Sequence, residues 1–170
     1  MSAAKHAGDP SGRHRTAARL AAVQALYQME LADEEPQSVI AEFVRHRLGQ
    51  PAEGPGYGEA DRGFFEQLAG GTAEHRDEID RAIVSALTPD WPLNRLEAVL
   101  RAILRCGVFE LSHRRDVPPQ IAINEYLDIA HAFFAGKEPG MVNGVLDKIA
   151  RGCRAEEMKE SRRGLEPAAR

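Results

Sequence analysis

The chain has 170 residues, with 22 lysines and arginines against 26 aspartates and glutamates, and a formal net charge of −4. Hydrophobic residues make up 43% of it, which is typical of a globular protein with its own core. No apolar run approaches the roughly 18 residues that span a membrane, and the first residues lack the apolar stretch of a secretory signal. Cys106 and Cys153 form no CxxC motif, so the sequence predicts a protein of the reducing cytoplasm.

The charge is unevenly distributed, so the net charge does not exclude a nucleic-acid partner. Residues 30–90 hold 14 acidic against 5 basic side chains, whereas residues 1–19 carry a net charge of +3. Most of the basic residues are arginines, whose planar guanidinium group suits phosphate. The amino-terminal segment is therefore a candidate for contact with RNA or DNA.

Apolar residues recur at spacings of three and four, and no segment alternates with period two, so the sequence predicts helices throughout. The first helix is expected over about residues 11–31. A second is expected over 39–48, after an interruption at Glu35 and Pro36. The segment 49–60 is rich in glycine and proline and predicts a surface loop.

Two shorter helices are expected next. One begins near residues 64–65 and ends or kinks at Gly70 and Gly71, because glycine weakens a helix interior. The other carries apolar residues at helical spacing over 72–87, and Pro89 closes it.

The second half of the chain has the clearest periodicity. A long amphipathic helix is expected over 93–111. A helix over 119–134 starts with proline and has apolar residues on nearly every face, so we expect it at the centre of the core. The last helix is expected over 140–150, and the chain beyond about residue 155 is expected to fray. Six or seven helices with short links predict an all-α bundle.

No catalytic motif is recognisable. A phosphate-binding GxxxxGK[ST] loop and an HExxH motif are both absent from the sequence. Spacing alone assembles no Ser, Cys or paired-carboxylate mechanism. The sequence therefore favours a non-catalytic protein, with no cofactor and no metal ion expected.

Two stretches favour binding. Arg13, Arg15 and Arg19 precede or enter the first helix, where backbone N–H groups can contact phosphate; the alternative is an ordinary solvated terminus. At the start of the last helix, Asn143 offers donor and acceptor groups. There Met141 is either a hydrophobic staple for the helix or a support for an unstacked base or a partner protein.

Three stretches resemble the transcription antitermination factor NusB family. RLAAVQALYQMEL at residues 19–31 is similar to the family's N-terminal helix. RAILRCGVFELSHRRDVPPQIAINEYLDIAHAFF at 101–134 and MVNGVLDKIAR at 141–151 are similar to its C-terminal signature, in the same order. The resemblance covers about residues 13–152.

The resemblance implies a NusB-like helical bundle in two small subdomains, each built around about three helices. The expected organisation is a flexible arm at residues 1–12, an RNA-binding helical domain at 13–155 and a disordered tail at 156–170.

The resemblance also implies a non-catalytic role in transcription antitermination. Family members pair with the small-subunit ribosomal protein that serves as NusE. The pair binds the single-stranded boxA element of nascent ribosomal RNA and joins RNA polymerase with NusA and NusG. The alternative is an RNA-targeting module related to the N-terminal domain of ribosomal RNA cytosine methyltransferases. Relatives are monomers or homodimers, and both states remain open.

Residue by residue, the resemblance assigns RNA binding to two segments. The family's Arg-rich N-terminal segment matches the start of the first helix, and its second RNA-facing patch matches residues 137–143. The expected RNA-binding residues are Arg13, Arg15, Arg19, Lys137, Met141 and Asn143.

Overall fold

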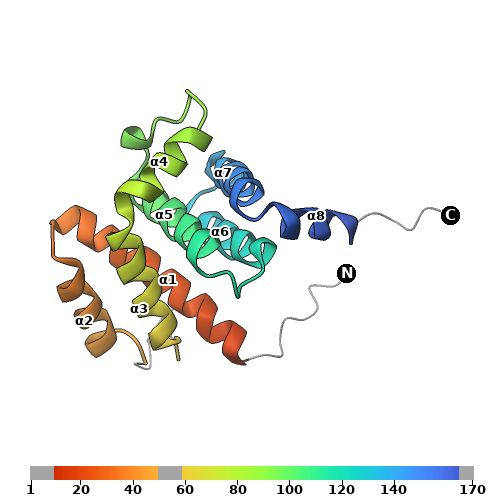
Figure 1. Ribbon diagram of the computed structural model, residues 1–170. Helices are drawn as coiled ribbons and strands as arrows, with labels where there is room; N and C mark the ends of the chain where they lie inside the picture. Colours follow the sequence, from red (N-terminus) through yellow and green to blue (C-terminus); the bar gives the residue numbers. More distant parts are fainter. Residues whose placement is uncertain (1–9, 50–58, 165–170) are drawn as a thin grey trace. The chain divides into compact units, whose positions relative to one another are not determined.

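The computed structural model describes residues 10–49 and 59–164 (Figure 1). Within these residues there are eight α-helices, one short 3-10 helix and no strand, which confirms the expected all-α fold. None of these helices is long and apolar enough to cross a membrane. The chain divides into two compact units, residues 1–70 and 71–170, which agrees with the expected number of subdomains. The described part of the second unit contains five α-helices rather than about three.

The first unit contains α1 (Pro10–Ala32), α2 (Pro36–His46) and most of α3 (Arg62–Glu74). Small side chains on α1 and aromatic rings on α2 and α3 fill its interior. The rings of Phe43 and Phe65 stack with their centroids 5.7 Å apart and join α2 to α3. Fully buried residues of this unit are Ala18, Ala21, Ala22, Val23, Ala25, Val39, Phe43, Phe65, Leu68 and Ala69.

The connections of the first unit follow local chemistry. Asp33 has a positive φ of 50°, a conformation that Asp adopts more readily than most residues, and it lies directly after α1. Pro36 then opens α2 in the first turn, where a missing N–H costs nothing, so the expected interruption is confirmed. Asp61 caps α3, because its carboxylate accepts a hydrogen bond of 3.0 Å from the N–H of Phe64. Residues 50–58 of the expected loop lie outside the described residues.

The two glycines of α3 do not end it. The helix continues through Gly70 and Gly71 to Glu74, so of the two expected outcomes, an end or a kink, the end was wrong. The break falls at His75 before α4 (Arg76–Ala86). Gly71 is required by packing, since a Cβ atom there would overlap the ring of Phe109.

The second unit is built around α5 (Ala98–His113). This helix packs against α4, α6 (Pro119–Phe133) and α7 (Glu138–Cys153) (Figure 1). Every residue from 102 to 111 is buried.

The central helix therefore differs from the expected one. The helix expected at the centre was α6, but its Ile121 is 50% exposed and its Phe133 44% exposed. The long helix expected over 93–111 begins only at Ala98, after the 3-10 turn Leu93–Arg95. Local apolar periodicity did not reveal which of two apolar helices the others surround.

Two polar pairs tie α5 to its neighbours. The buried Arg105 donates hydrogen bonds of 2.7 and 3.0 Å to the two carboxylate oxygens of Asp80 on α4. The fully buried Glu110 accepts a hydrogen bond of 3.0 Å from the hydroxyl of Tyr126 on α6. Because an unpaired charge is costly in the interior, these pairs restrict the register of α5. The tyrosine of the INEYLDIA segment is thus a structural residue.

The carboxy-terminal segment also differs from the expectation of disorder. Residues Ala155–Arg163 form α8, while residues 165–170 lie outside the described part. The preceding Arg154 is 3% exposed and donates to the carbonyl of Val117 at 2.7 Å and to that of Arg115 at 3.1 Å. It also binds the carboxylate of Glu157, whose pKa it lowers by this hydrogen bond. A long-range contact of one arginine therefore holds the start of α8.

The adjacent glycines of α3 provide a matched pair of substitutions. We expect Gly71→Ala to lower the free energy of unfolding by about 1–3 kcal/mol, because the new methyl group overpacks against Phe109. Gly70→Ala, whose Cβ would make an ordinary 3.7 Å contact with Ile40, should raise it by about 0.5–1 kcal/mol through helix propensity. Urea unfolding measures both, and equal effects would contradict the packing assignment.

Candidate nucleic-acid and partner surfaces

The amino-terminal arginines lie on α1, which begins at Pro10. The guanidinium carbons of Arg15 and Arg19 are 4.9 and 5.0 Å from the centroid of the Phe64 ring. This ring is 3% exposed and comes from the first turn of α3. Two cations near one aromatic ring form cation–π contacts, which hold both side chains in defined positions.

The three arginines are not equally available. Residues four apart share a face of a helix, so Arg15 and Arg19 lie together and Arg13 projects from another side. Arg13 is exposed, Arg15 is half-buried, and Arg19 is only 3% exposed. The burial of Arg19 gives it a packing role beside Phe64, in contrast to the expected contact with RNA.

Backbone contacts hold the same end of α1 against the residues before α3. The N–H of Asp61 donates to the carbonyl of His14 at 3.0 Å. The side chain of His14 lies 3.4 Å from a carboxylate oxygen of Glu59. The position of the arginines in the first unit therefore depends on α3 as well as on α1.

In the second unit, the expected binding residues lie at the start of α7. Lys137 is the N-cap residue and accepts a backbone hydrogen bond of 3.1 Å from Met141. Lys137 and Asn143 are exposed and Met141 is half-buried. A hydrophobic staple would need an apolar residue at position 136, where the chain has Gly136, so the staple interpretation of Met141 is wrong.

Two glycines leave the surface of α7 bare between the expected contacts. Gly140 and Gly144 are exposed, and a Cβ atom at either position would meet nothing within 4 Å. Helical geometry places them on one stripe, with Met141 and Asn143 on its two flanks. Glycine destabilises a helix interior, and no packing contact with residues 10–49 or 59–164 accounts for it here. The bare backbone suits a ligand that approaches closely.

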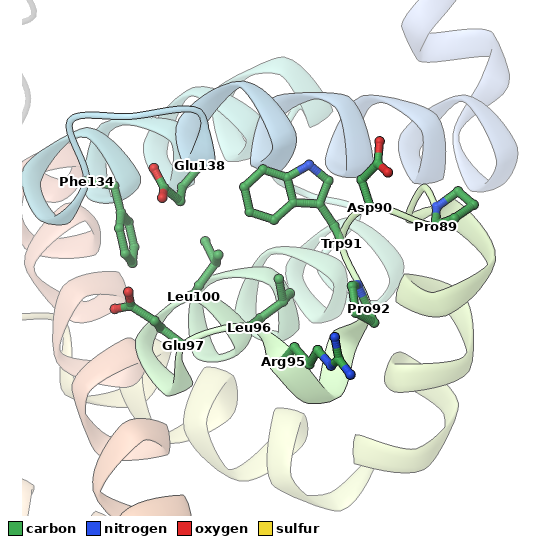
Figure 2. A pocket seen from close by; sticks show the side chains of 10 residues that line it. All are labelled: Pro89, Asp90, Trp91, Pro92, Arg95, Leu96, Glu97, Leu100, Phe134 and Glu138. Atoms are coloured by element: carbon green, nitrogen blue, oxygen red, sulfur yellow. The ribbon is translucent and has the colours of Figure 1, made fainter.

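A pocket of about 370 Å³ lies elsewhere in the second unit (Figure 2). Trp91 and Phe134 stand on its two sides, and Leu96 and Leu100 lie between them. The sequence did not predict this pocket, because its residues come from separate segments. The complete lining is Pro89, Asp90, Trp91, Pro92, Arg95, Leu96, Glu97, Leu100, Phe134 and Glu138.

The pocket favours a cationic group. Glu97 and Glu138 both line it, and the Oε2 atom of Glu138 is buried without a hydrogen-bond partner among the residues that the structure describes. A buried carboxylate oxygen of this kind is stabilised by a donor, above all by a charged one. The neighbouring rings of Trp91 and Phe134 suit the same chemistry, since aromatic faces attract cations.

An apolar pair is exposed on α1. Tyr27 is 39% exposed and Leu31, one turn later, is 61% exposed. Large apolar side chains that share a helix face and remain in water are typical of protein contacts. The first unit thus has an arginine-bearing end and an apolar end on the same helix.

Neither cysteine is suited to nucleophilic catalysis. The thiol of Cys106 is completely buried, and burial raises its pKa, which removes the reactive thiolate. The pKa of the half-buried Cys153 is also raised, chiefly by burial. The fold and its surfaces define an all-α binding protein with candidate contacts to an anion and to a protein.

Comparisons with known proteins identify the family. The model of the NusB family matches residues 16–151, and the chain belongs to this family. It is 49% identical to the transcription antitermination protein NusB of Bradyrhizobium sp. (strain BTAi1) over 152 residues, which cover 89% of this chain and 90% of the relative. It is 46% identical to the same-named protein of Agrobacterium fabrum, over 92% of this chain and 98% of the relative.

Solved structures agree with this relationship. NusB of T. maritima is similar with a TM-score of 0.67 and 30% identity, over 86% of this chain and 96% of that chain. A crystal structure of antitermination factors NusB and NusE in complex with dsRNA also matches, with a TM-score of 0.67 and 28% identity over 82% and 98%. The predicted family and fold are thereby confirmed.

Proposed function

We propose that this protein is a non-catalytic transcription antitermination factor of the cytoplasm. As an RNA-binding adaptor it pairs with NusE, binds boxA in nascent ribosomal RNA and joins RNA polymerase with NusA and NusG. The observation that carries this proposal is near full-length similarity to proteins named as NusB antitermination proteins. The similar structure of NusB with NusE and RNA supports an adaptor that holds both ligands.

The RNA contacts in this proposal come from both units. Arg13 and Arg15 pair with phosphates, and Arg19 positions Arg15 through their shared contact with Phe64. At the N-cap of α7, Lys137 contributes charge. In the same segment, Met141 is an apolar support for a base, and Asn143 is a hydrogen-bonding group.

In this proposal NusE contacts an acidic pocket and an exposed apolar pair, both of which suit a protein partner. The carboxylates of Glu97 and Glu138, next to Trp91, suit a lysine or arginine of a basic ribosomal protein. The exposed apolar pair Tyr27 and Leu31 would lose its contact with water when NusE binds, as the apolar centre of a protein interface does.

The alternative function, an RNA-targeting module related to rRNA cytosine methyltransferases, has less support. The relatives described above are named as antitermination proteins over about nine-tenths of their length. A methyl-transfer assay with a labelled donor and ribosomal RNA separates the two functions, because an adaptor produces no labelled RNA.

Titration with boxA RNA and with a scrambled sequence tests the proposal. We expect weak binding by the protein alone, and tighter, boxA-selective binding when NusE is added. Equal affinity for both sequences, with and without NusE, would contradict the proposal. Sedimentation of the same samples measures stoichiometry, and it shows whether a homodimer of the free chain dissociates when the ligands bind.

The exposed arginine of α1 should act through charge. We expect Arg13→Ala to weaken boxA binding and to reduce the slope of log affinity against log salt by about 0.7, the value for one phosphate contact on a single strand. Arg45→Ala on α2 removes another exposed charge of the first unit and serves as the control. If both variants change the slope equally, a specific role for Arg13 is excluded.

A substitution in the glycine stripe of α7, formed by Gly140 and Gly144, should change stability and RNA binding in opposite directions. Gly144→Ala should raise the free energy of unfolding by about 0.5–1 kcal/mol, because the methyl group meets nothing. It should also weaken binding of RNA with NusE, because the methyl group blocks close approach. Gly152→Ala, equally open on the same helix, is the matched control and should leave binding unchanged. Unchanged binding by Gly144→Ala would exclude a ligand on this stripe.

A further inference from the structure

Two histidines and a glutamate lie together at the break between α3 and α4. His75 is the residue between these helices, Glu78 lies in the first turn of α4, and His113 ends α5. One potential ligand atom from each lies within 4.8 Å of the other two. The sequence did not predict this cluster, because its third member lies far along the chain and reaches the others only in the folded unit.

An aromatic stack brings the two imidazole rings together. The ring of His113 lies on Phe109, with centroids 4.7 Å apart and planes 10° apart. The ring of His75 lies 4.5 Å from that of His113, and its Nδ1 atom is 3.5 Å from a carboxylate oxygen of Glu78. Phe109 in turn occupies the space that Gly71 leaves open. The geometry of the cluster is therefore supported from the core outward.

The surrounding charges permit a cation at this place. The arginine that follows each histidine is paired with a carboxylate: Arg76 lies 3.8 Å from Asp80, and Arg114 lies 2.9 Å from Asp116. His113 also belongs to the last turn of α5, where the helix dipole favours positive charge.

We propose that His75, Glu78 and His113 form a binding site for a divalent transition-metal ion, with Zn²⁺ as the best match. Two imidazole nitrogens and one carboxylate oxygen are ligands that zinc accepts, and a water molecule or an external group completes four-coordination. Ligand atoms of a tetrahedral zinc site are closer together than 4.8 Å. The site therefore forms by small rotations of the exposed Glu78 and His113 side chains. The bound ion joins the start of α4 to the end of α5.

Metal titration of the untagged full chain tests the site. After removal of metals with a chelator, calorimetry with Zn²⁺ should show one ion per chain, and the melting temperature should rise as the ion binds the folded state. Glu78→Gln leaves the aromatic stack intact, so its folding is not at risk. It should lower the affinity about tenfold or more, because a charged ligand is lost. His113→Ala should have at least the same effect.

The control is His131→Ala, which removes an exposed histidine of α6 and should leave zinc binding unchanged. Substitution with Co²⁺ gives a visible spectrum that reports the ligands. A change of this spectrum in Glu78→Gln supports the site. The proposal is overturned by an unchanged affinity in Glu78→Gln, by equal losses in the control, or by a thiolate band that assigns the ion to Cys153.

Discussion

The burial of α5 is the constraint on which the second unit depends. This helix is in contact with α4, α6 and α7 and has no exposed residue between 102 and 111, although it carries Arg105 and Glu110. Each buried charge has to be matched by a hydrogen-bonding partner, because little or none of it is open to solvent. Asp80 and Tyr126 are those partners. They restrict how α4 and α6 can dock, and thereby where the first turn of α7, the pocket beside Trp91 and the histidine cluster are placed.

In the first unit, a helix and an aromatic ring position the arginines. Arginines near a terminus usually sample many conformations, but here α1 begins at Pro10 and carries them on a helix. The Phe64 ring orders Arg15 and Arg19, while Arg13 stays exposed. A preordered phosphate contact loses less side-chain entropy on binding than a flexible one. This arrangement explains how an acidic protein of net charge −4 can present a local cationic surface.

Sequence patterns predicted the helices well where one face was apolar, and failed where tertiary contacts overrode local preference. Gly70 and Gly71 were expected to end or kink α3, yet the helix continues through both, and Phe109 makes glycine necessary at position 71. The charged segment after Arg154 was expected to be disordered, yet this arginine finds carbonyl partners nearly 40 positions earlier in the chain. The exposure of the arginines was not predicted either, although Arg19 lies one turn before the buried Val23, on the same face of α1.

The sequence by itself determined the helical class, the two-part organisation and the membership of the NusB family, because apolar periodicity and the INEYLDIA and VNGVLDKIA segments are local in the chain. Only the tertiary structure decided which helix is central, which arginine meets solvent, and that Met141 has no staple partner. It also brought Trp91 near Phe134 and His75 near His113. Such pairings depend on the free energy of packing distant segments, which no short stretch of sequence contains.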